Sequence, residues 1–158
     1  MQLLKIYYAY FSPGNTTEKV VSHIASSFQN YPVESINLTD YATRQEDYYF
    51  KENELLIIGV PAYGGRVPAP VVDALRNFTG SNTPVVLVAT YGNRDIDDTL
   101  IELKKNVIDK GFIPVGAASF VCQHTFLKEC AEGRPDEEDL KMAREFGDKL
   151  KERLRLLV

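Results

Sequence analysis

The sequence predicts an α/β protein whose parallel five-stranded sheet is covered by helices on both faces. Short runs of β-branched and aromatic apolar residues alternate with longer segments whose apolar residues recur at helical spacing. The apolar runs are continuous rather than alternating, which is typical of strands buried on both faces. With 158 residues, of which 44% are hydrophobic, the chain suits a single domain spanning residues 1–158.

The first half of the chain holds three predicted strands and one crossover helix. The strands are Leu3–Tyr10, Val33–Leu38 and Leu55–Val60. Between the first two lies a helical stripe formed by Val20, Val21, Ile24, Ala25 and Phe28. The segment Thr39–Asn53 is polar and rich in tyrosine with weak periodicity, so we predict a short helix or a loop there.

The second half continues the alternation and ends in a long helix. The two strands are Pro84–Thr90 and Ile113–Val121, and the crossover helices carry the stripes Val71, Val72, Leu75, Phe78 and Leu100, Leu103, Val107, Ile108. The final helix starts with Pro135 in its first turn and has acidic residues near its start and basic residues near its end, as the helix dipole favours. Its predicted apolar face is Leu140, Ala143, Leu150 and Leu154.

Composition excludes several classes of protein. The 18 basic and 22 acidic residues give a net charge of −4 without long like-charge runs, which argues against a general nucleic-acid binder and against binding to an anionic membrane surface. The longest apolar runs are too short to span a bilayer and the start lacks a leader pattern, so we expect a cytoplasmic protein. Cys122 and Cys130 cannot form an iron–sulfur run or a Cys-x-x-Cys pair. We expect two inert thiols, although their spacing leaves a disulfide open.

The loop after the first predicted strand suits a phosphate group. Tyr10 to Thr17 reads Tyr-Phe-Ser-Pro-Gly-Asn-Thr-Thr and leads directly into the first helix. Hydroxyls, a glycine and the unpaired amides at a helix start can replace the hydration of a phosphate. The pattern of a P-loop and that of a dinucleotide-binding loop are both absent from this loop. An ordinary helix cap by Ser12 or Asn15 explains the same residues equally well.

The loops after the third and fourth predicted strands suit a flat ring system. They read Pro61-Ala62-Tyr63-Gly64-Gly65-Arg66-Val67-Pro68 and Thr90-Tyr91-Gly92-Asn93-Arg94-Asp95. Glycines let the backbone approach a flat ligand, and Tyr63 and Tyr91 can flank one ring between them. In an open α/β sheet, ligands bind beyond the carboxyl ends of the strands, where these three loops lie. Arg66 and Arg94 contact the ring, a partner or only solvent.

Together these residues resemble flavodoxins. The first loop is similar to the family's FMN phosphate loop, commonly Ser/Thr-x-Thr-Gly-x-Thr, except that Gly14 replaces a threonine and Asn15 replaces a glycine. Asn15 tolerates the left-handed conformation that glycine would supply. The other two loops resemble the isoalloxazine-binding loops of a subgroup often fused to a bacterial-type ferredoxin, as do Gln123-His124-Thr125-Phe126 and Gly133-Arg134-Pro135-Asp136. The two cysteines cannot supply the iron–sulfur ligands of a ferredoxin part, so we expect the flavodoxin part alone.

The resemblance implies a flavodoxin-like three-layer sandwich with strand order 2-1-3-4-5. It implies FMN as cofactor and electron transfer between redox partner proteins, such as a ferredoxin or a reductase, by a monomer or weak homodimer. It implies neither a catalytic residue nor a metal ligand, and His124 takes a structural or a gating role. The implied FMN-binding residues are Ser12, Pro13, Gly14, Asn15, Thr16, Thr17, Pro61, Ala62, Tyr63, Gly64, Gly65, Thr90, Tyr91, Gly92, Asn93, Arg94 and Asp95.

Two other functions stay open at the level of sequence. An FMN-dependent NAD(P)H:quinone or flavin oxidoreductase can be built on the same fold, because the fold alone does not determine function. A degenerate, cofactor-free binding module is compatible with the altered phosphate loop. A phospho-receiver domain is disfavoured, because Ser12 and Pro61 stand where acidic residues are needed.

Overall fold

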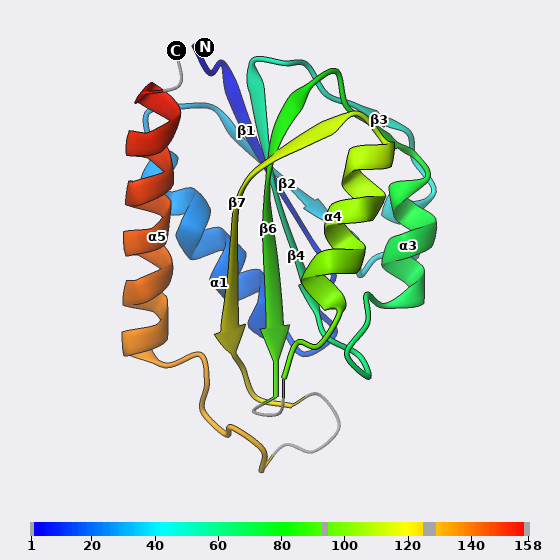
Figure 1. The fold of residues 1–158 in the computed structure, drawn as a ribbon. Coiled ribbons are helices and arrows are strands. Elements are labelled where there is room, and N and C mark those ends of the chain that lie inside the picture. Colours follow the sequence, from blue (N-terminus) through cyan, green and yellow to red (C-terminus); the bar gives the residue numbers. More distant parts are fainter. Residues whose placement is uncertain (1, 93–94, 125–128, 157–158) are drawn as a thin grey trace.

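A parallel five-stranded sheet forms the centre of the protein (Figure 1). The computed structural model describes residues 2–92, 95–124 and 129–156. The sheet strands are β1 (Lys5–Tyr10), β2 (Val33–Asn37), β4 (Glu54–Pro61), β6 (Thr83–Tyr91) and β7 (Phe112–Val121). Their order is β2-β1-β4-β6-β7, and every neighbouring pair is parallel. Numbered along the chain within this sheet, the order is 2-1-3-4-5, as predicted.

Helices cover both faces of the sheet (Figure 1). On one face lie α1 (Thr16–Ala25), continued by the 3₁₀ turn η1 (Ser26–Phe28), and α5 (Glu137–Leu156). On the other lie α3 (Ala69–Leu75) and α4 (Thr99–Asp109). In the described part of the chain, no helix combines the length and the apolarity that crossing a membrane would require.

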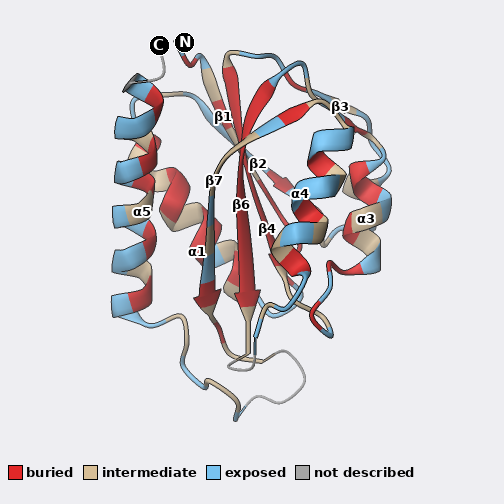
Figure 2. Ribbon diagram, viewed as in Figure 1, coloured by how far each residue is buried: buried red, intermediate tan, exposed pale blue. Residues whose placement is uncertain are grey.

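Burial is complete in the middle of the sheet and incomplete at its edges (Figure 2). β4 and β6 are buried over all but their last residues, which confirms the prediction from their continuous apolar runs. The prediction was wrong for β2, which is mostly exposed, and for β7, where only Phe112 and Phe120 are buried. Both are edge strands with a neighbour on one side only, so the helices above and below do not enclose them.

The polar segment Thr39–Asn53 contains more structure than predicted. It holds α2 (Tyr41–Arg44), which is capped by Asp40 because the Asp40 carboxylate accepts a hydrogen bond from the Thr43 amide at 3.0 Å. It also holds β3 (Tyr48–Tyr49), which pairs in parallel with β5 (Phe78–Thr79) in a second, two-stranded sheet.

Two predicted helix features were wrong, and one was confirmed. Phe78 is not part of α3, which ends at Leu75; instead it lies in β5 and packs on Phe50 with ring centroids 5.4 Å apart. Ile108 on α4 is 47% exposed rather than buried. The apolar face of α5 is confirmed for Ala143, Leu150 and Leu154, which are buried, whereas Leu140 is half-buried.

The last helix starts later than predicted. α5 begins at Glu137, so Pro135 precedes it instead of occupying its first turn. Asp136 and Asp139 form a reciprocal cap: the Asp139 amide donates to Asp136 Oδ1 at 3.0 Å and the Asp136 amide to Asp139 Oδ2 at 2.9 Å. This exchange makes Asp136 the capping residue, which fixes the helix start one residue after it.

Candidate functional site

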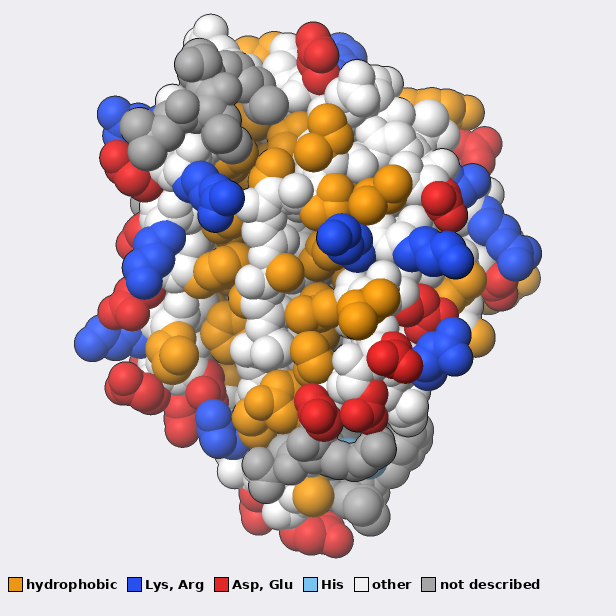
Figure 3. Space-filling model, viewed as in Figure 1, with side chains coloured by type: hydrophobic (Ala, Val, Ile, Leu, Met, Phe, Trp, Pro, Cys, Tyr) orange, Lys and Arg blue, Asp and Glu red, His pale blue; other side chains and the backbone are white. Residues whose placement is uncertain are grey.

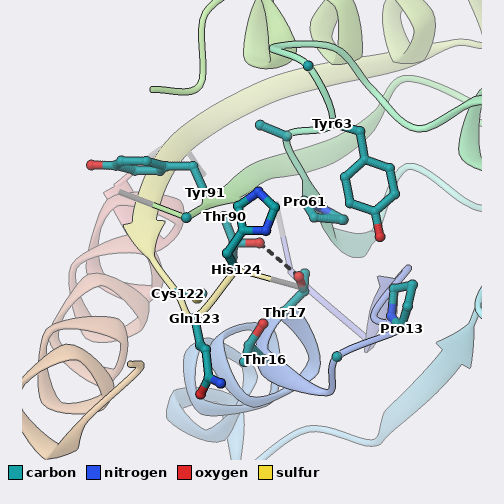
Figure 4. A pocket seen from close by; sticks show the side chains of 14 residues that line it. Pro13, Thr16, Thr17, Pro61, Tyr63, Thr90, Tyr91, Cys122, Gln123 and His124 are labelled. Atoms are coloured by element: carbon teal, nitrogen blue, oxygen red, sulfur yellow. Dashed lines mark hydrogen bonds between the residues drawn. The ribbon is translucent and has the colours of Figure 1, made fainter. Parts of the chain in front are cut away.

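The carboxyl ends of the strands surround a cavity of about 210 Å³ (Figure 4). The loops after β1, β4 and β6 all contribute to it, as the sequence predicted, and the segment after β7 completes it. The lining residues are Pro13, Gly14, Thr16, Thr17, Pro61, Ala62, Tyr63, Gly64, Thr90, Tyr91, Gly92, Cys122, Gln123 and His124. Lysine, arginine and carboxylate side chains are missing from this lining among the described residues, so backbone amides, hydroxyls and the Gln123 and His124 side chains supply its polar groups.

The start of α1 leaves two backbone amides free at the cavity. Asn15 adopts the left-handed conformation, with φ 66°, as predicted from its tolerance of that region. Its amide donates to the Ser12 carbonyl at 3.1 Å, and the Glu18 amide donates to Ser12 Oγ at 3.0 Å. Of the four amides that a helix start leaves unpaired, those of Thr16 and Thr17 thus have no acceptor within the described chain. Both residues line the cavity.

Ser12 itself serves the loop and not the cavity. Its side chain is buried, with 5% of its surface exposed, and its Oγ caps α1 as described above. Its amide donates to Thr39 Oγ1 at 2.7 Å, which joins the loop to the segment after β2. These contacts fit the helix-cap explanation of Ser12, and Ser12 is not among the residues that line the cavity.

Two threonine hydroxyls join α1 to β6 beneath the cavity. Thr17 Oγ1 and Thr90 Oγ1 lie 2.8 Å apart, and both side chains are buried (Figure 4). Two hydroxyls carry two hydrogens, and their mutual bond uses one of them. The second O–H can donate to a ligand, so the pair adds one neutral donor beside the amides of Thr16 and Thr17.

A tight turn shapes the wall of the cavity after β4. The amides and carbonyls of Tyr63 and Arg66 exchange hydrogen bonds at 2.9 and 3.0 Å, and both intervening glycines have positive φ, 58° at Gly64 and 76° at Gly65. Positive φ at both central residues is the requirement of a type I′ turn, which explains the glycine pair. Gly64 faces open space, whereas Gly65 is buried against Asp97.

Arg66 anchors this turn to α4. Its guanidinium donates to both carboxylate oxygens of Glu102, at 3.0 and 2.9 Å, and Glu102 Oε1 also accepts from the Val67 amide at 2.9 Å. The hydrogen bond from Arg66 is the main reason why the pKa of Glu102 lies below its ordinary value. Arg66 therefore has a structural role, holding the turn against α4, and is not a ligand-binding cation.

The aromatic walls differ from the predicted arrangement. Tyr63 and Tyr91 both line the cavity, but Figure 4 shows the ring of Tyr91 directed away from Tyr63, with the imidazole of His124 between them in this view. Tyr63 is held by an edge-to-face contact with Phe11, with ring centroids 6.2 Å apart. A side chain at Gly92 would come within 2.7 Å of the His124 ring, so the glycine makes room for the imidazole. Tyr63, Tyr91 and His124 therefore all line the cavity, and in this structure the ring of His124 lies between the two tyrosines in the view of Figure 4.

The sequence prediction missed Cys122 and Gln123 as lining residues. Both follow directly after β7, so the rule that sites lie at the carboxyl ends of strands could have found them. The Gln123 amide donates to the Arg134 carbonyl at 2.8 Å, and Arg134 holds Asp139 through two hydrogen bonds at 2.6 and 2.7 Å. Burial raises the pKa of the Cys122 thiol to about 12, and both cysteines are free. The Cys122 thiol thus stays protonated.

Some predicted site residues lie outside the cavity lining. Asn15 and Gly65 shape the backbone, as described above, and Ser12 caps α1. Asp95 is exposed and its carboxylate accepts from the Ile96 amide at 2.7 Å. Asn93 and Arg94 lie outside the described residues.

Comparison with known proteins relates the fold, but not the sequence, to flavodoxins. No protein-family model matches the chain. A flavodoxin from the domain Archaea superposes with a TM-score of 0.66 at 15% identity, covering 96% of this chain and 99% of the other. Oxidised flavodoxin 2 from Bacillus cereus gives a TM-score of 0.65 at 16% identity, covering 94% and 99%. At these identities the likeness establishes the flavodoxin fold alone.

A second match concerns only part of the chain. Ribonuclease Z of Staphylococcus aureus strain MSSA476 is 39% identical over 62 residues, which cover 35% of this chain and 20% of that enzyme. The chain thus spans about a fifth of the length of the curated relatives it matches.

Proposed function

We propose that this chain, which has the flavodoxin fold, binds FMN in the cavity and transfers electrons between redox partner proteins. One observation carries the proposal. Unpaired amides at the start of α1 line the same cavity as the flat side chains of Tyr63 and His124. A ligand with an anionic group at one end and a flat ring system at the other matches this arrangement, and FMN has both.

The donor set fits a phosphate without a cation. The amides of Thr16 and Thr17 sit at the positive end of the α1 dipole, and the Thr17–Thr90 pair offers a further O–H. Hydrogen bonds to a charged acceptor are about twice as strong as neutral ones, so three such donors can replace the lost hydration. The Glu18 carboxylate accepts from the Tyr10 hydroxyl at 3.2 Å, and among the described residues neither the Thr16 nor the Thr17 amide donates to it.

The remaining walls fit a flat heterocycle. Tyr63 and His124 offer ring faces, and the backbone of Gly64 and Gly92 can approach the ring edge because neither residue has a side chain. FMN, when bound, supplies the capacity to take up and release one or two electrons. The protein residues hold the phosphate, orient the ring and exclude water from part of it.

The surface near the cavity supports a partner protein as the source or acceptor of electrons. Asp95, Asp97 and Asp98 are exposed in the segment that leads from β6 to α4. The chain as a whole carries a net charge of −4. Acidic groups beside the cavity favour docking of a partner with a basic surface, and they steer that partner during association. A ferredoxin or a reductase of that charge is the partner class that we propose.

The test starts with reconstitution. Purified protein freed of ligand is titrated with FMN, and the visible absorption bands and quenched fluorescence of the flavin report binding. We expect one FMN per chain, followed by reduction by an NADPH-dependent flavodoxin reductase and reoxidation by an electron acceptor protein. Direct oxidation of NADPH by the loaded protein alone, with a quinone as acceptor, would instead assign an oxidoreductase. Failure to bind FMN would refute the proposed function and favour a cofactor-free binding module.

A charge variant and its neutral match test the location of the phosphate. In Thr16→Asp, a carboxylate at the first helical position repels a phosphate while it favours the helix dipole, so the fold is retained. Thr16→Asn has nearly the same shape and no charge. We expect Thr16→Asp to lose at least about a hundredfold in FMN affinity relative to Thr16→Asn, because like charges a few ångströms apart repel strongly in a partly buried site. Equal affinities of the two variants would place the phosphate elsewhere.

A further inference from the structure

The edge strand β7 is long, uncharged and unpaired on its outer side. It runs for ten residues from Phe112 to Val121, and within the described chain its only strand partner is β6. The opposite edge, β2, is five residues long and carries Glu34, which forms an ion pair with Lys5 at 3.3 Å. Short length and charge protect an edge strand against pairing with another chain, and β7 has neither. A proline, Pro114, and a register shift next to it interrupt β7 only near its start, so residues 116–121 form a regular edge.

Exposed apolar side chains surround this strand. Ile113 on β7 is 49% exposed, Ile101 and Ile108 on α4 are 70% and 47% exposed, and Met142 on α5 is 53% exposed. Figure 3 shows this face of the molecule: hydrophobic side chains run down its middle, and charged side chains of both signs lie on either side. An apolar strip with a charged rim is the usual anatomy of a protein interface.

The charges of α5 indicate which partner fits. Glu137 and Glu138 are exposed at its start, and Arg153 and Arg155 are exposed at its end. A second copy that adds its β7 in antiparallel orientation is related by a two-fold axis perpendicular to the sheet. That axis keeps both α5 helices on the same face and sets them antiparallel, so the acidic start of each lies beside the basic end of the other. The charges on α5 are thus complementary to the charges on α5 of a second copy that runs in the opposite direction.

We propose that β7 is a dimerisation edge, at which a second copy of this chain pairs its own β7 in antiparallel orientation and extends the sheet across both copies. The cavity adjoins the end of β7 at Cys122, so this arrangement places the two cavities at opposite ends of the joined sheet and leaves both open. The dimer does not depend on FMN, and its test is independent of the proposed function.

Sedimentation velocity tests the association of the full chain, from micromolar to near-millimolar concentration with a thiol reductant present. We expect a reversible dimer of the unmodified protein. Ser119→Lys introduces a charge at an exposed position within the regular part of β7 in each copy, so the dimer dissociation constant should rise at least about tenfold. The matched control Val33→Lys introduces the same charge on β2, at a residue that is 42% exposed, and should leave the constant unchanged.

A charge exchange on α5 tests the orientation of the two copies. Glu138→Arg should weaken the dimer, and adding Arg153→Glu in the same chain should restore it, because the pattern is then reversed but again complementary. Circular dichroism and thermal melting establish that each variant is folded. Any of three results would overturn the proposal. The first is a monomer at all concentrations, and the second is a dimer that Val33→Lys weakens and Ser119→Lys does not. The third is a double variant whose dimer dissociation constant is no lower than that of Glu138→Arg.

Discussion

The Thr17–Thr90 hydroxyl pair allows stability and ligand binding to be separated. Its oxygens lie 2.8 Å apart, and only 2% and 1% of the two residues are exposed. Thr17→Val removes one hydroxyl and leaves the other buried without its partner, which costs about 1–3 kcal/mol. For a chain of this size each kcal/mol lowers Tm by roughly 2–4 °C, so we expect a fall of roughly 2–12 °C.

The double variant Thr17→Val/Thr90→Val should behave differently. Replacing both partners by apolar groups of similar shape is nearly neutral, so most of the lost stability should return. FMN affinity should not return, because in the double variant no hydroxyl of the pair remains to donate to the ligand. A hydrogen bond to a charged group contributes about 1.5–3 kcal/mol, which predicts a loss of roughly ten- to a hundredfold in affinity.

Thermal melting and FMN titration are measured for the unmodified protein, the two single variants and the double variant. The four proteins form one double-mutant cycle for stability and one for FMN affinity. Additive destabilisation in the double variant would show that the two hydroxyls do not interact. Recovery of FMN affinity together with stability would show that the pair only supports the fold, and would remove it from the proposed phosphate site.

Three further predictions concern the neighbouring parts of the site. Gly92→Ala should displace the His124 ring, because the added Cβ would lie 2.7 Å from it. FMN affinity should then fall while Tm changes little. Unchanged FMN affinity would refute a contact between His124 and the flavin ring. In mildly alkaline buffer, Cys122 should resist iodoacetamide in the native protein and react after unfolding, because burial raises the pKa of its thiol to about 12. Mass spectrometry of the labelled peptide checks this prediction. Rapid labelling of Cys122 in the native protein would contradict it. The Arg66–Glu102 ion pair should stabilise the fold fully above the unfolded pKa of glutamate, about 4.3, and this stabilisation should be lost as the pH falls through the lower folded pKa of Glu102. In urea unfolding, Glu102→Gln should therefore lose less stability on acidification than the unmodified protein. Equal losses would refute this prediction.

The sequence predicts the layers of the fold because each apolar run and helical stripe reports burial directly. The strands β4 and β6 and the apolar face of α5 follow from these patterns. The exposure of β7 could not be predicted in this way, because an apolar run does not reveal whether a strand has one neighbour or two. Phe78 continues the stripe of α3 by spacing, and only its packing on Phe50 in a second small sheet shows that the helix has already ended.

The site is predicted in part for a similar reason. Loop positions follow from the order of the strands, so the three glycine-containing loops meet as expected around one cavity. Side-chain directions depend on tertiary contacts that the sequence does not show. Ser12 Oγ accepts from the Glu18 amide, the Arg66 guanidinium donates to Glu102, and the His124 ring lies between Tyr63 and Tyr91 in the view of Figure 4. The Asn15 backbone is the exception: the resemblance places Asn15 where a glycine is usual, and asparagine tolerates the left-handed conformation that the structure shows.

The central claim is that neutral donors at the start of α1 hold the phosphate of a flavin whose ring lies against Tyr63. Comparing the affinities of ligand-free protein for FMN and for riboflavin, by quenching of flavin fluorescence, tests it most directly, since the two ligands differ only in that phosphate. We predict one FMN per chain, bound at least about a hundredfold more tightly than riboflavin, because three charge-assisted hydrogen bonds are lost with the phosphate. Equal affinities, or no uptake of FMN at micromolar concentration, would contradict the claim.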